Sequence, residues 1–400
     1  MGTNQKSILF ITTQLPYPPK SGGTVKSWNY IKDLAQRYDL SLATLLKDDD
    51  ADYVEALKEK ISFHHFLAEK HQTARSAKTL LDSYLGFPCL NVFRNYSPAF
   101  YKKVQDRIHE SDMVIIDHYE VFQYVPNNYK GKVILHTHNA EFMLWRRLAE
   151  LENNPLKKLL LKMEAKRVAK YEQSIFDRSH LIFTTESDQE LYHKHGFKLG
   201  NVETTYHLGN EQLLDLEGLN FSDTELALCF MGTLSWEPNI DGLIWFLKEV
   251  WPLLKKEFPQ LKFYILGKDP DQRIKTVVQE DPHVIFTGFV KNLDDYLKKT
   301  RVYLAPLRFG SGMKVKVLEG LYRGVPTVST SVGAEGLKVE DGKHIMIADQ
   351  AEEFASKCIQ LLQNETLWNT IKKESRILAD KQYRWAPLFD RMDQSVKKLI

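Results

Sequence analysis

Cysteine is scarce in this sequence: its 400 residues include three, Cys89, Cys229 and Cys358, widely spaced and without a CxxC pair. This spacing excludes a disulfide framework and a zinc motif, so we expect three small core residues in a reducing compartment. No apolar run approaches the ~20 residues that a membrane-spanning helix needs. The N-terminus also lacks the anatomy of a signal peptide. Together these absences predict a cytoplasmic protein.

An excess of charge of either sign is also missing. Lys and Arg number 54 and Asp and Glu 52, a net charge of +2, which does not favour nucleic acid as a partner. One local exception is residues 153–173, where a leucine-rich face accompanies Lys157, Lys158, Lys162, Lys166, Arg167 and Lys170. A basic amphipathic helix of this kind is either a solvated outer helix or a peripheral contact with the inner face of a membrane.

Short β-branched runs alternate with helical stretches along the whole chain, which is typical of parallel sheets covered by helices. The pattern occurs twice, on either side of a polar segment without periodicity. The predicted strands are SILFIT, LSLATLL, MVIID, KVILHTH and HLIFTT, then LALCFMG, LKFYILG, HVIFTG, VYLAPL and TVST. We therefore predict two doubly wound α/β domains that face a central cleft. The boundaries are 1–205 for the first domain, 206–225 for a linker, 226–380 for the second domain and 381–400 for a terminal helix that packs back toward the first.

The clearest chemical motif is GSGMKVKVLEGLYRGVP, residues 310–326. Gly310 and Gly312 loosen a turn, and a helix starting near Met313 would leave unpaired N–H groups and a positive dipole end for a phosphate. Lys314 and Lys316 add whole charges. The alternative is a plain loop followed by a surface ion pair between Lys316 and a glutamate three residues later.

That glutamate is Glu319, about two turns into the predicted helix, where it could accept hydrogen bonds from vicinal ribose hydroxyls. Gly324 and Pro326 then end the helix. The motif therefore predicts a site for a phosphorylated ligand, and specifically for a nucleotide.

A second anion site is predicted after the first strand, where Gly22 and Gly23 precede a helix. This loop does not match GxGxxG, and no acidic residue closes the following strand, which weakens a dinucleotide interpretation. In the second domain, Gly232 and Thr233 form a tight turn after the first strand. At the end of a later strand, Phe289 and Val290 could contact a base, although Phe289 could equally belong to the core.

A group of polar residues, HTHNAE, follows the strand KVIL. His136, His138, Asn139 and Glu141 could bind a metal, but alternate strand residues point to opposite faces and no third ligand set appears, so we expect no zinc. We expect His138 to contact substrate; the alternative is a histidine that caps the helix beginning near Glu141. Asp117 and His118 also lie at a strand end. No DxD motif stands where a metal-dependent transferase would need it.

With these residues in place, the chain resembles the retaining glycosyltransferases of family four, which have the GT-B architecture of two Rossmann-like domains. The resemblance covers nearly the full length. The segments that carry it are PYPPKSGG (16–23), HTHNAE (136–141), GTLSWEPNIDG (232–242), FTGFV (286–290) and APLRFGSGMKVKVLEGLYRGVPTVSTSVGAEGL (305–337).

The resemblance implies roles for individual residues. Glu319 matches the second glutamate of the family's pair, which holds the donor ribose, and His138 matches a histidine that contacts the transferred sugar. The catalytic residues expected are His138, Lys314 and Lys316. The donor-binding residues expected are Gly22, Gly23, Gly232, Thr233, Phe289, Val290, Gly310, Ser311, Gly312, Met313, Lys314, Val315, Lys316 and Glu319.

The sequence departs from the family at two places. The first glutamate of the pair falls at Ser311, and TLSWEPNID contains neither the Arg nor the Lys expected after the first strand of the second domain. Lys314 and Lys316 would then offset the charge of the leaving diphosphate, with Arg308 a weaker candidate.

The predicted activity is metal-independent transfer of a sugar, with retention, from a nucleoside-diphosphate sugar to a hydroxyl of a saccharide, lipid-linked or protein acceptor. UDP or GDP is the expected carrier, and no cofactor is needed. Two alternatives stay open: a GT-B nucleotide-sugar epimerase, which would ignore acceptors, and a non-catalytic nucleotide-sugar-binding partner of another transferase, which would bind donor without turnover. The base, the sugar and the acceptor are not specified by these motifs.

Overall fold

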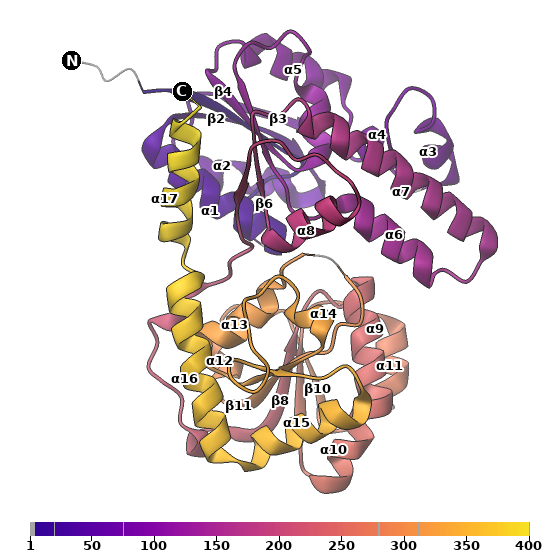
Figure 1. The fold of residues 1–400 in the computed structure, drawn as a ribbon, viewed down its shortest axis with the longest axis vertical. Coiled ribbons are helices and arrows are strands. Elements are labelled where there is room, and N and C mark those ends of the chain that lie inside the picture. The colour runs from indigo at the N-terminus through magenta and orange to yellow at the C-terminus, as the bar shows by residue number, and fades with distance from the viewer. Residues whose placement is uncertain (1–4, 20, 75, 279–280, 311, 400) are drawn as a thin grey trace. The chain divides into compact units, whose positions relative to one another are not determined.

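The computed structural model describes residues 5–19, 21–74, 76–278, 281–310 and 312–399. They form two compact units, residues 1–207 with 386–400 and residues 208–385. The chain therefore passes from one unit to the other twice, after His207 and again after Trp385. Each unit is a parallel sheet with helices packed around it (Figure 1).

The first unit contains a parallel sheet in the order β3-β2-β1-β4-β5-β6-β7. Its strands are β1 (Ser7–Thr12), β2 (Asp39–Leu46), β3 (Phe66–Lys70), β4 (Met113–Asp117), β5 (Lys132–His136), β6 (Leu181–Thr184) and β7 (Val202–Thr204). Its helices are α1 (Gly22–Arg37), α2 (Val54–Lys58), α3 (Ala77–Asp82), α4 (Leu90–Arg94), α5 (Pro98–Ile108), α6 (Glu141–Leu151), α7 (Pro155–Phe176), α8 (Glu186–Lys194) and α17 (Trp385–Lys397). The five strands predicted for this half are confirmed.

The second unit contains a parallel sheet in the order β10-β9-β8-β11-β12-β13. Its strands are β8 (Glu225–Met231), β9 (Lys262–Leu266), β10 (Val284–Gly288), β11 (Thr300–Ala305), β12 (Thr327–Ser329) and β13 (Met346–Ile347). Its helices are α9 (Glu237–Trp245), α10 (Trp251–Glu257), α11 (Gln272–Val278), α12 (Asp294–Leu297), α13 (Val315–Arg323), α14 (Ser331–Ala334), α15 (Ala351–Gln363) and α16 (Glu365–Gln382). A turn of π-helix, Phe246–Val250, joins α9 to α10.

The central strands are buried on both faces, which explains why they are apolar throughout rather than alternating. In β1, Leu9 and Ile11 belong to the core cluster that also contains Phe100 of α5 and Val168 of α7. Phe10, one residue out of phase, makes an edge contact with Tyr30 of α1 instead. Since successive side chains of a strand point to opposite faces, the two sets of contacts show that helices cover both sides of this sheet.

The order of the strands determines where each unit can bind a ligand. In both sheets the order of the strands reverses direction at the first strand of the unit. In the first sheet β1 lies between β2 and β4, and in the second sheet β8 lies between β9 and β11. In such sheets the crevice for ligands opens at the carboxyl ends of these strands. The residues that follow β1, β4, β8 and β11 are therefore the candidates for ligand binding.

Three cysteines are buried and free, as predicted from their spacing. Among the described residues, no helix combines the length and apolar character needed to cross a bilayer.

Candidate functional site

In the second unit, the turn after β8 meets the start of α13. The backbone carbonyl of Thr233 accepts a hydrogen bond from Nδ2 of Asn239 at 2.9 Å, and Oδ1 of the same amide accepts one from Nζ of Lys316. Asn239 therefore links the β8 turn to the α13 lysine. The Lys316 ammonium also lies 4.4 Å from the ring centroid of Phe230, a cation–π contact that helps hold it there.

Gly232 leaves room for this arrangement. A Cβ built at this position would lie 2.6 Å from Nδ2 of Asn239 and 3.0 Å from Nζ of Lys316. Only a glycine fits beside both groups, so the backbone of the β8 turn approaches the lysine directly. Burial, and secondarily the charge of Lys314, lower the pKa of Lys316 to about 7. Lys316 is thus an ammonium whose charge state an anionic ligand can change.

Lys314 precedes α13 and is 94% buried, a much more enclosed position than a surface lysine has. Its Nζ donates to the carbonyl of Gly312 and lies 3.6 Å from Oε2 of Glu335. The helix begins at Val315, two residues later than the start predicted near Met313, because the backbone of Lys314 is still extended. Gly310 and Gly312 have φ angles of 144° and 73°, so the loop does use the conformational freedom that glycine provides.

Glu319 lies on the buried side of α13. Its Oε1 accepts a hydrogen bond from the backbone N–H of Asn210 at 3.0 Å, whereas Oε2 is buried and has no hydrogen-bond partner among the described residues. A Cβ at Gly209 would lie 2.4 Å from Oε1, so the chain passes very close to this carboxyl group. Burial raises the pKa of Glu319 to about 7. The interpretation of Glu319 as half of a surface ion pair with Lys316 is wrong, because neither side chain is paired with the other.

The remaining predicted residues of this unit that the structure describes follow β10 or β11 in the chain. Phe289 is 63% exposed, so it is not a core residue, and Nζ of Lys268 lies 5.2 Å from its ring centroid. Val290 is half-buried and Met313 is buried, while Val315 is the first residue of α13. Ser311 lies outside the described residues. Arg308 is committed to a bidentate ion pair with Asp241 and is not free to meet a phosphate.

The first unit gathers three histidines, His118, His136 and His138, around one carboxylate. Asp117, fully buried at the end of β4, accepts hydrogen bonds from the hydroxyls of Thr12 and Ser27 on Oδ2. Its Oδ1 is 2.8 Å from Nδ1 of His136 and 2.8 Å from Nε2 of His138. Burial opposes ionisation of Asp117, but the imidazoles of His138, His118 and His136 outweigh it and hold its pKa well below the usual range.

His138 is held by this carboxylate rather than by a helix end. Burial and the neighbouring His118 lower its pKa well below the usual value, so the ring is neutral and donates its Nε2 proton to Asp117. Nδ1 is then an acceptor; it is buried and has no partner among the described residues. The alternative role as a cap of α6 is wrong, because Glu172 accepts the N–H groups of Glu141 and Phe142 there.

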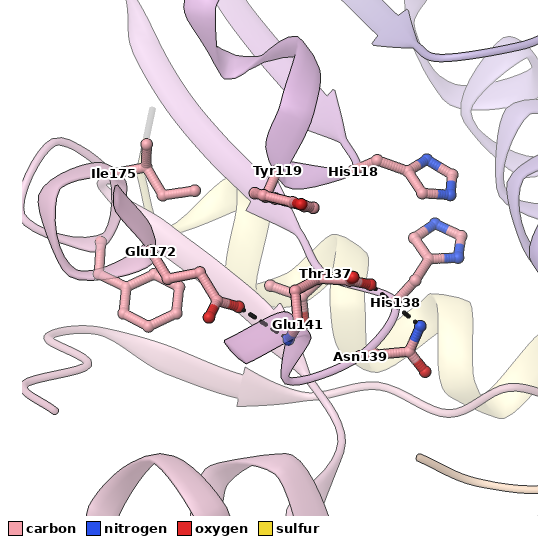
Figure 2. Close-up of a pocket in the computed structure, with 9 residues that line it drawn as sticks. His118, Tyr119, Thr137, His138, Asn139, Glu141, Glu172 and Ile175 are labelled. Carbon is pink, nitrogen blue, oxygen red and sulfur yellow. Dashed lines mark hydrogen bonds between the residues drawn. The ribbon is translucent and has the colours of Figure 1, made fainter. Parts of the chain in front are cut away.

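His118 stacks on His138 with ring centroids 3.7 Å apart (Figure 2). His118 is one of the described non-glycine residues with a positive φ, 87°, a strained conformation that the histidine adopts at the end of β4. A Cβ at Gly23 would lie 3.6 Å from Nδ1 of His138 and 3.8 Å from Nε2 of His118. Both rings therefore face the first turn of α1. Gly22 and Gly23 form that turn instead of preceding it, and Ser21 caps the helix.

Two residues that sequence reasoning missed hold this backbone in place. Nζ of Lys26, buried in α1, donates to the carbonyl of Thr137 at 2.8 Å. Nε2 of His207 is 2.7 Å from the carbonyl of His138. Burial lowers the pKa of Lys26 to about 7. Nothing in the sequence around Lys26 indicates that this lysine is buried. His207 lies in the segment that we interpreted as a linker.

Glu172 is a further buried acid that sequence reasoning missed. It lies on α7, lines the pocket of Figure 2 and accepts a hydrogen bond from the hydroxyl of Tyr192 at 2.6 Å. Burial raises its pKa to about 8. Since both of its oxygens already serve the start of α6, its role is to fix the loop that carries His138.

Asp117, His136 and His138 could together surround a metal ion, since their ligand atoms lie within 4.8 Å of one another. The hydrogen bonds argue for a different state. Each oxygen of Asp117 already accepts two hydrogen bonds. Burial and the nearby charge of Lys26 lower the pKa of His136 to about 4, and the same two causes disfavour an added positive charge at this place. The atoms of these three residues that face one another are already engaged in a hydrogen-bond network.

Comparison with known proteins places this geometry in context. Residues 225–364, most of the second unit, match the family model described as glycosyl transferases group 1. An uncharacterized 44.6 kDa protein in the cps region of Klebsiella pneumoniae is 26% identical over 373 residues, which are 89% of this chain and 91% of that protein.

Solved structures resemble the chain over its whole length. They include Anabaena Alr3699/HepE in complex with UDP and glucose (TM-score 0.69, 98% of this chain and 100% of that chain) and sucrose-phosphate synthase from Thermosynechococcus elongatus (0.72, 99% of both). A third is the pneumococcal O-GlcNAc transferase GtfA in complex with UDP and GlcNAc (0.65, 99% of both). Each is 14% identical to this chain, so the likeness shows the fold. The predicted GT-B fold of two Rossmann-like domains is confirmed, and the family match supports a group 1 glycosyltransferase.

Proposed function

From the match of residues 225–364 to the glycosyl transferases group 1, we propose that this protein transfers a sugar from a nucleoside-diphosphate sugar to an acceptor hydroxyl, with retention of configuration. The observation that carries the proposal is a pair of ionisable groups on α13, the half-buried Lys316 and the buried Glu319. The ammonium of Lys316 lies beside the β8 turn, and Glu319 keeps one buried carboxylate oxygen that has no partner in the described part of the chain.

The diphosphate of the donor would bind at Lys316, next to the N–H groups at the start of α13. A helix N-terminus and a lysine both favour an anion, and the close approach of Gly232 lets the backbone contribute as well. Lys314 adds its positive charge from the preceding residue. Thr233 and the residues of the glycine turn, Gly310 to Gly312, complete the expected phosphate contacts.

The ribose would bind at Oε2 of Glu319. Oε1 is already engaged by the N–H of Asn210, which leaves one oxygen to accept hydrogen bonds from vicinal hydroxyls. The exposed ring of Phe289 and the backbone around Val290 would contact the base. UDP or GDP is the proposed carrier; the first is supported by the UDP bound in Alr3699/HepE and in GtfA.

The first unit would contribute His138. Its Nδ1 is an acceptor because the ring carries its proton on Nε2 and donates it in a hydrogen bond to Asp117, so Nδ1 suits a sugar hydroxyl near the first turn of α1. Gly22 and Gly23 keep that approach free of side chains. The acceptor would be a saccharide, lipid-linked or protein hydroxyl, and the relative from the cps region of Klebsiella pneumoniae supports a role in glycan biosynthesis.

The proposed reaction follows from positioning and electrostatics. The bond from the anomeric carbon to the leaving phosphate oxygen breaks while the acceptor oxygen bonds to that carbon on the same face. The released diphosphate oxygen takes the proton of the acceptor hydroxyl. Lys316 and Lys314 stabilise the charge that develops on the diphosphate, so the proposal needs no metal and no protein nucleophile. Ser311 stands where the family has its first glutamate, so sugar recognition would differ there.

A donor screen tests the proposal. Purified protein is incubated with UDP-, GDP-, ADP- and dTDP-sugars and candidate acceptors, release of nucleoside diphosphate is measured, and the product's anomeric configuration is determined by NMR. We expect one carrier to turn over with retention, and Lys316→Ala to abolish it. Conversion of the donor to an epimer without an acceptor, or stable donor binding without any turnover across a broad acceptor panel, would contradict the transferase.

A further inference from the structure

The long helix α7 exposes a line of large apolar side chains. Leu156, Leu159 and Met163 are 66%, 55% and 42% exposed, and their spacing of three and four residues places them along one side of the helix. Removing such side chains from water is favourable, so a solvated helix does not ordinarily keep three of them in one row. This row requires an explanation beyond the fold of the first unit.

The charges on α7 are sorted by sign. Four lysines of the helix, Lys157, Lys162, Lys166 and Lys170, are exposed, and none is ion-paired in the described part of the chain. Its two carboxylates are buried: Glu164 pairs with Arg167, and Glu172 caps α6. The surface of α7 that faces water therefore presents positive charge and apolar side chains without a negative one.

Helix α3 and the residues after it extend this surface. Leu81 and Leu85 are 68% and 78% exposed, and Tyr84 is 39% exposed. Arg167 joins the two elements, since its guanidinium donates to the carbonyl of Ser83 at 2.6 Å and lies 3.9 Å from the ring centroid of Tyr84. Leu81 and the residues after α3 thus belong to the same part of the molecule as α7, and Figure 1 shows the two helices near each other. We call this the α3–α7 surface: Leu81, Tyr84, Leu85, Leu156, Lys157, Leu159, Lys162, Met163, Lys166 and Lys170.

We propose that the α3–α7 surface docks on a bilayer that contains anionic phospholipids. The leucines would enter the boundary between headgroups and acyl chains, and the lysines would remain at the level of the phosphates. The exposed leucine side chains would leave water by entering the apolar part of the bilayer. The lysines around them would be attracted to its negatively charged headgroups. A nucleic acid would bind the lysines but leave the leucines in water. An anionic bilayer accounts for both the lysines and the leucines.

Vesicle co-sedimentation tests this docking. The full-length protein is mixed with phosphatidylcholine vesicles with or without about 30% phosphatidylglycerol. We expect binding to the anionic vesicles that falls with added salt, and at least tenfold weaker binding to neutral ones. Lys157→Gln/Lys162→Gln/Lys166→Gln/Lys170→Gln should weaken anionic binding about tenfold or more, and so should Leu81→Ser/Leu85→Ser/Leu156→Ser/Leu159→Ser.

The matched control is Lys248→Gln/Lys256→Gln/Lys373→Gln/Lys381→Gln. It removes four exposed lysines of the second unit and so changes the net charge of +2 by the same amount. We expect it to bind as the wild type does. Equal loss in the control, no loss in either α3–α7 variant, loss in the lysine variant alone, or no binding of wild-type protein to anionic vesicles would each overturn the proposal. Vesicle binding needs no nucleotide sugar, so failure here leaves the proposed transferase untouched.

Discussion

The amide of Asn239 joins Lys316 to the backbone of Thr233, accepting a hydrogen bond from the ammonium and donating one to the carbonyl. The lysine is therefore aimed at the β8 turn by a side chain from another helix. Without this amide, the long lysine side chain would sample several rotamers, and binding a ligand would have to restrict them.

This contact makes Asn239 a positioning residue. We expect Asn239→Ala to weaken binding of the nucleoside diphosphate about tenfold, which corresponds to the loss of a hydrogen bond to a charged group. Asn239→Asp should instead raise the pKa of Lys316, because it places a carboxylate beside the ammonium. Isothermal titration at several pH values distinguishes the two effects. Unchanged affinity in Asn239→Ala would contradict the positioning role.

Binding should depend on pH because the pKa of free Lys316 is lowered to about 7. An anion bound beside the ammonium raises that pKa, so binding takes up a proton between the free and the bound values. Affinity should therefore fall as pH rises above about 7, by up to about tenfold per pH unit. Lys316→Arg, which stays charged, should lose this slope. A wild-type affinity that is constant from pH 7 to 9 would count against Lys316 as the phosphate ligand.

The space at Gly232 gives a steric prediction. Gly232→Ala places a methyl group 2.6 Å from Nδ2 of Asn239 and 3.0 Å from Nζ of Lys316, so these side chains must shift. We expect nucleotide affinity to fall by about 1–3 kcal/mol, the usual cost of such overpacking. The matched control is Gly218→Ala in the same unit, where a Cβ would meet no atom within 4 Å. Affinities that change equally in both variants would remove Gly232 from the site.

Asp117 should act through His138. In Asp117→Asn, the side-chain amide would replace a carboxylate that accepts hydrogen bonds from both His136 and His138. The proton of His138 would then no longer be held on Nε2, and Nδ1 would no longer be fixed as the acceptor. We expect turnover to fall about 10²-fold or more while affinity for the nucleoside diphosphate, which rests on the second unit, is unchanged. Asp112→Asn, at the opposite end of the same strand, is the control. Histidine NMR spectra report the tautomer directly, and a variant that keeps the wild-type tautomer and rate would contradict this role.

The α13 site could be predicted largely from sequence because its parts are local. Gly310, Gly312, Lys316 and Glu319 stand within ten positions of one another, and helix periodicity relates them. The contact of Lys316 with Asn239 could not be predicted, since the two residues are 77 positions apart and meet only in the folded chain. A lysine and an asparagine carry no signal of pairing at that distance in sequence.

The cluster around Asp117 could be predicted only in part, for the same reason. His136 and His138 marked a strand end, but their common partner Asp117 comes from β4. The supporting Lys26 comes from α1, and His207 from the segment after β7. Strands β3, β7 and β13 were also missed. They lie at the edges of their sheets and are short or partly exposed, so the apolar pattern that identifies a central strand is weak there.

The most direct test of the account concerns Glu319. Isothermal titration would compare the selected nucleoside diphosphate with its 2′,3′-dideoxy form, on wild-type protein and on Glu319→Gln. If Oε2 of Glu319 binds the ribose, the wild type should bind the dideoxy form about 10- to 100-fold more weakly, whereas the variant should distinguish the two much less. Equal wild-type affinity for both forms, or equal discrimination by the variant, would contradict a nucleotide site on α13.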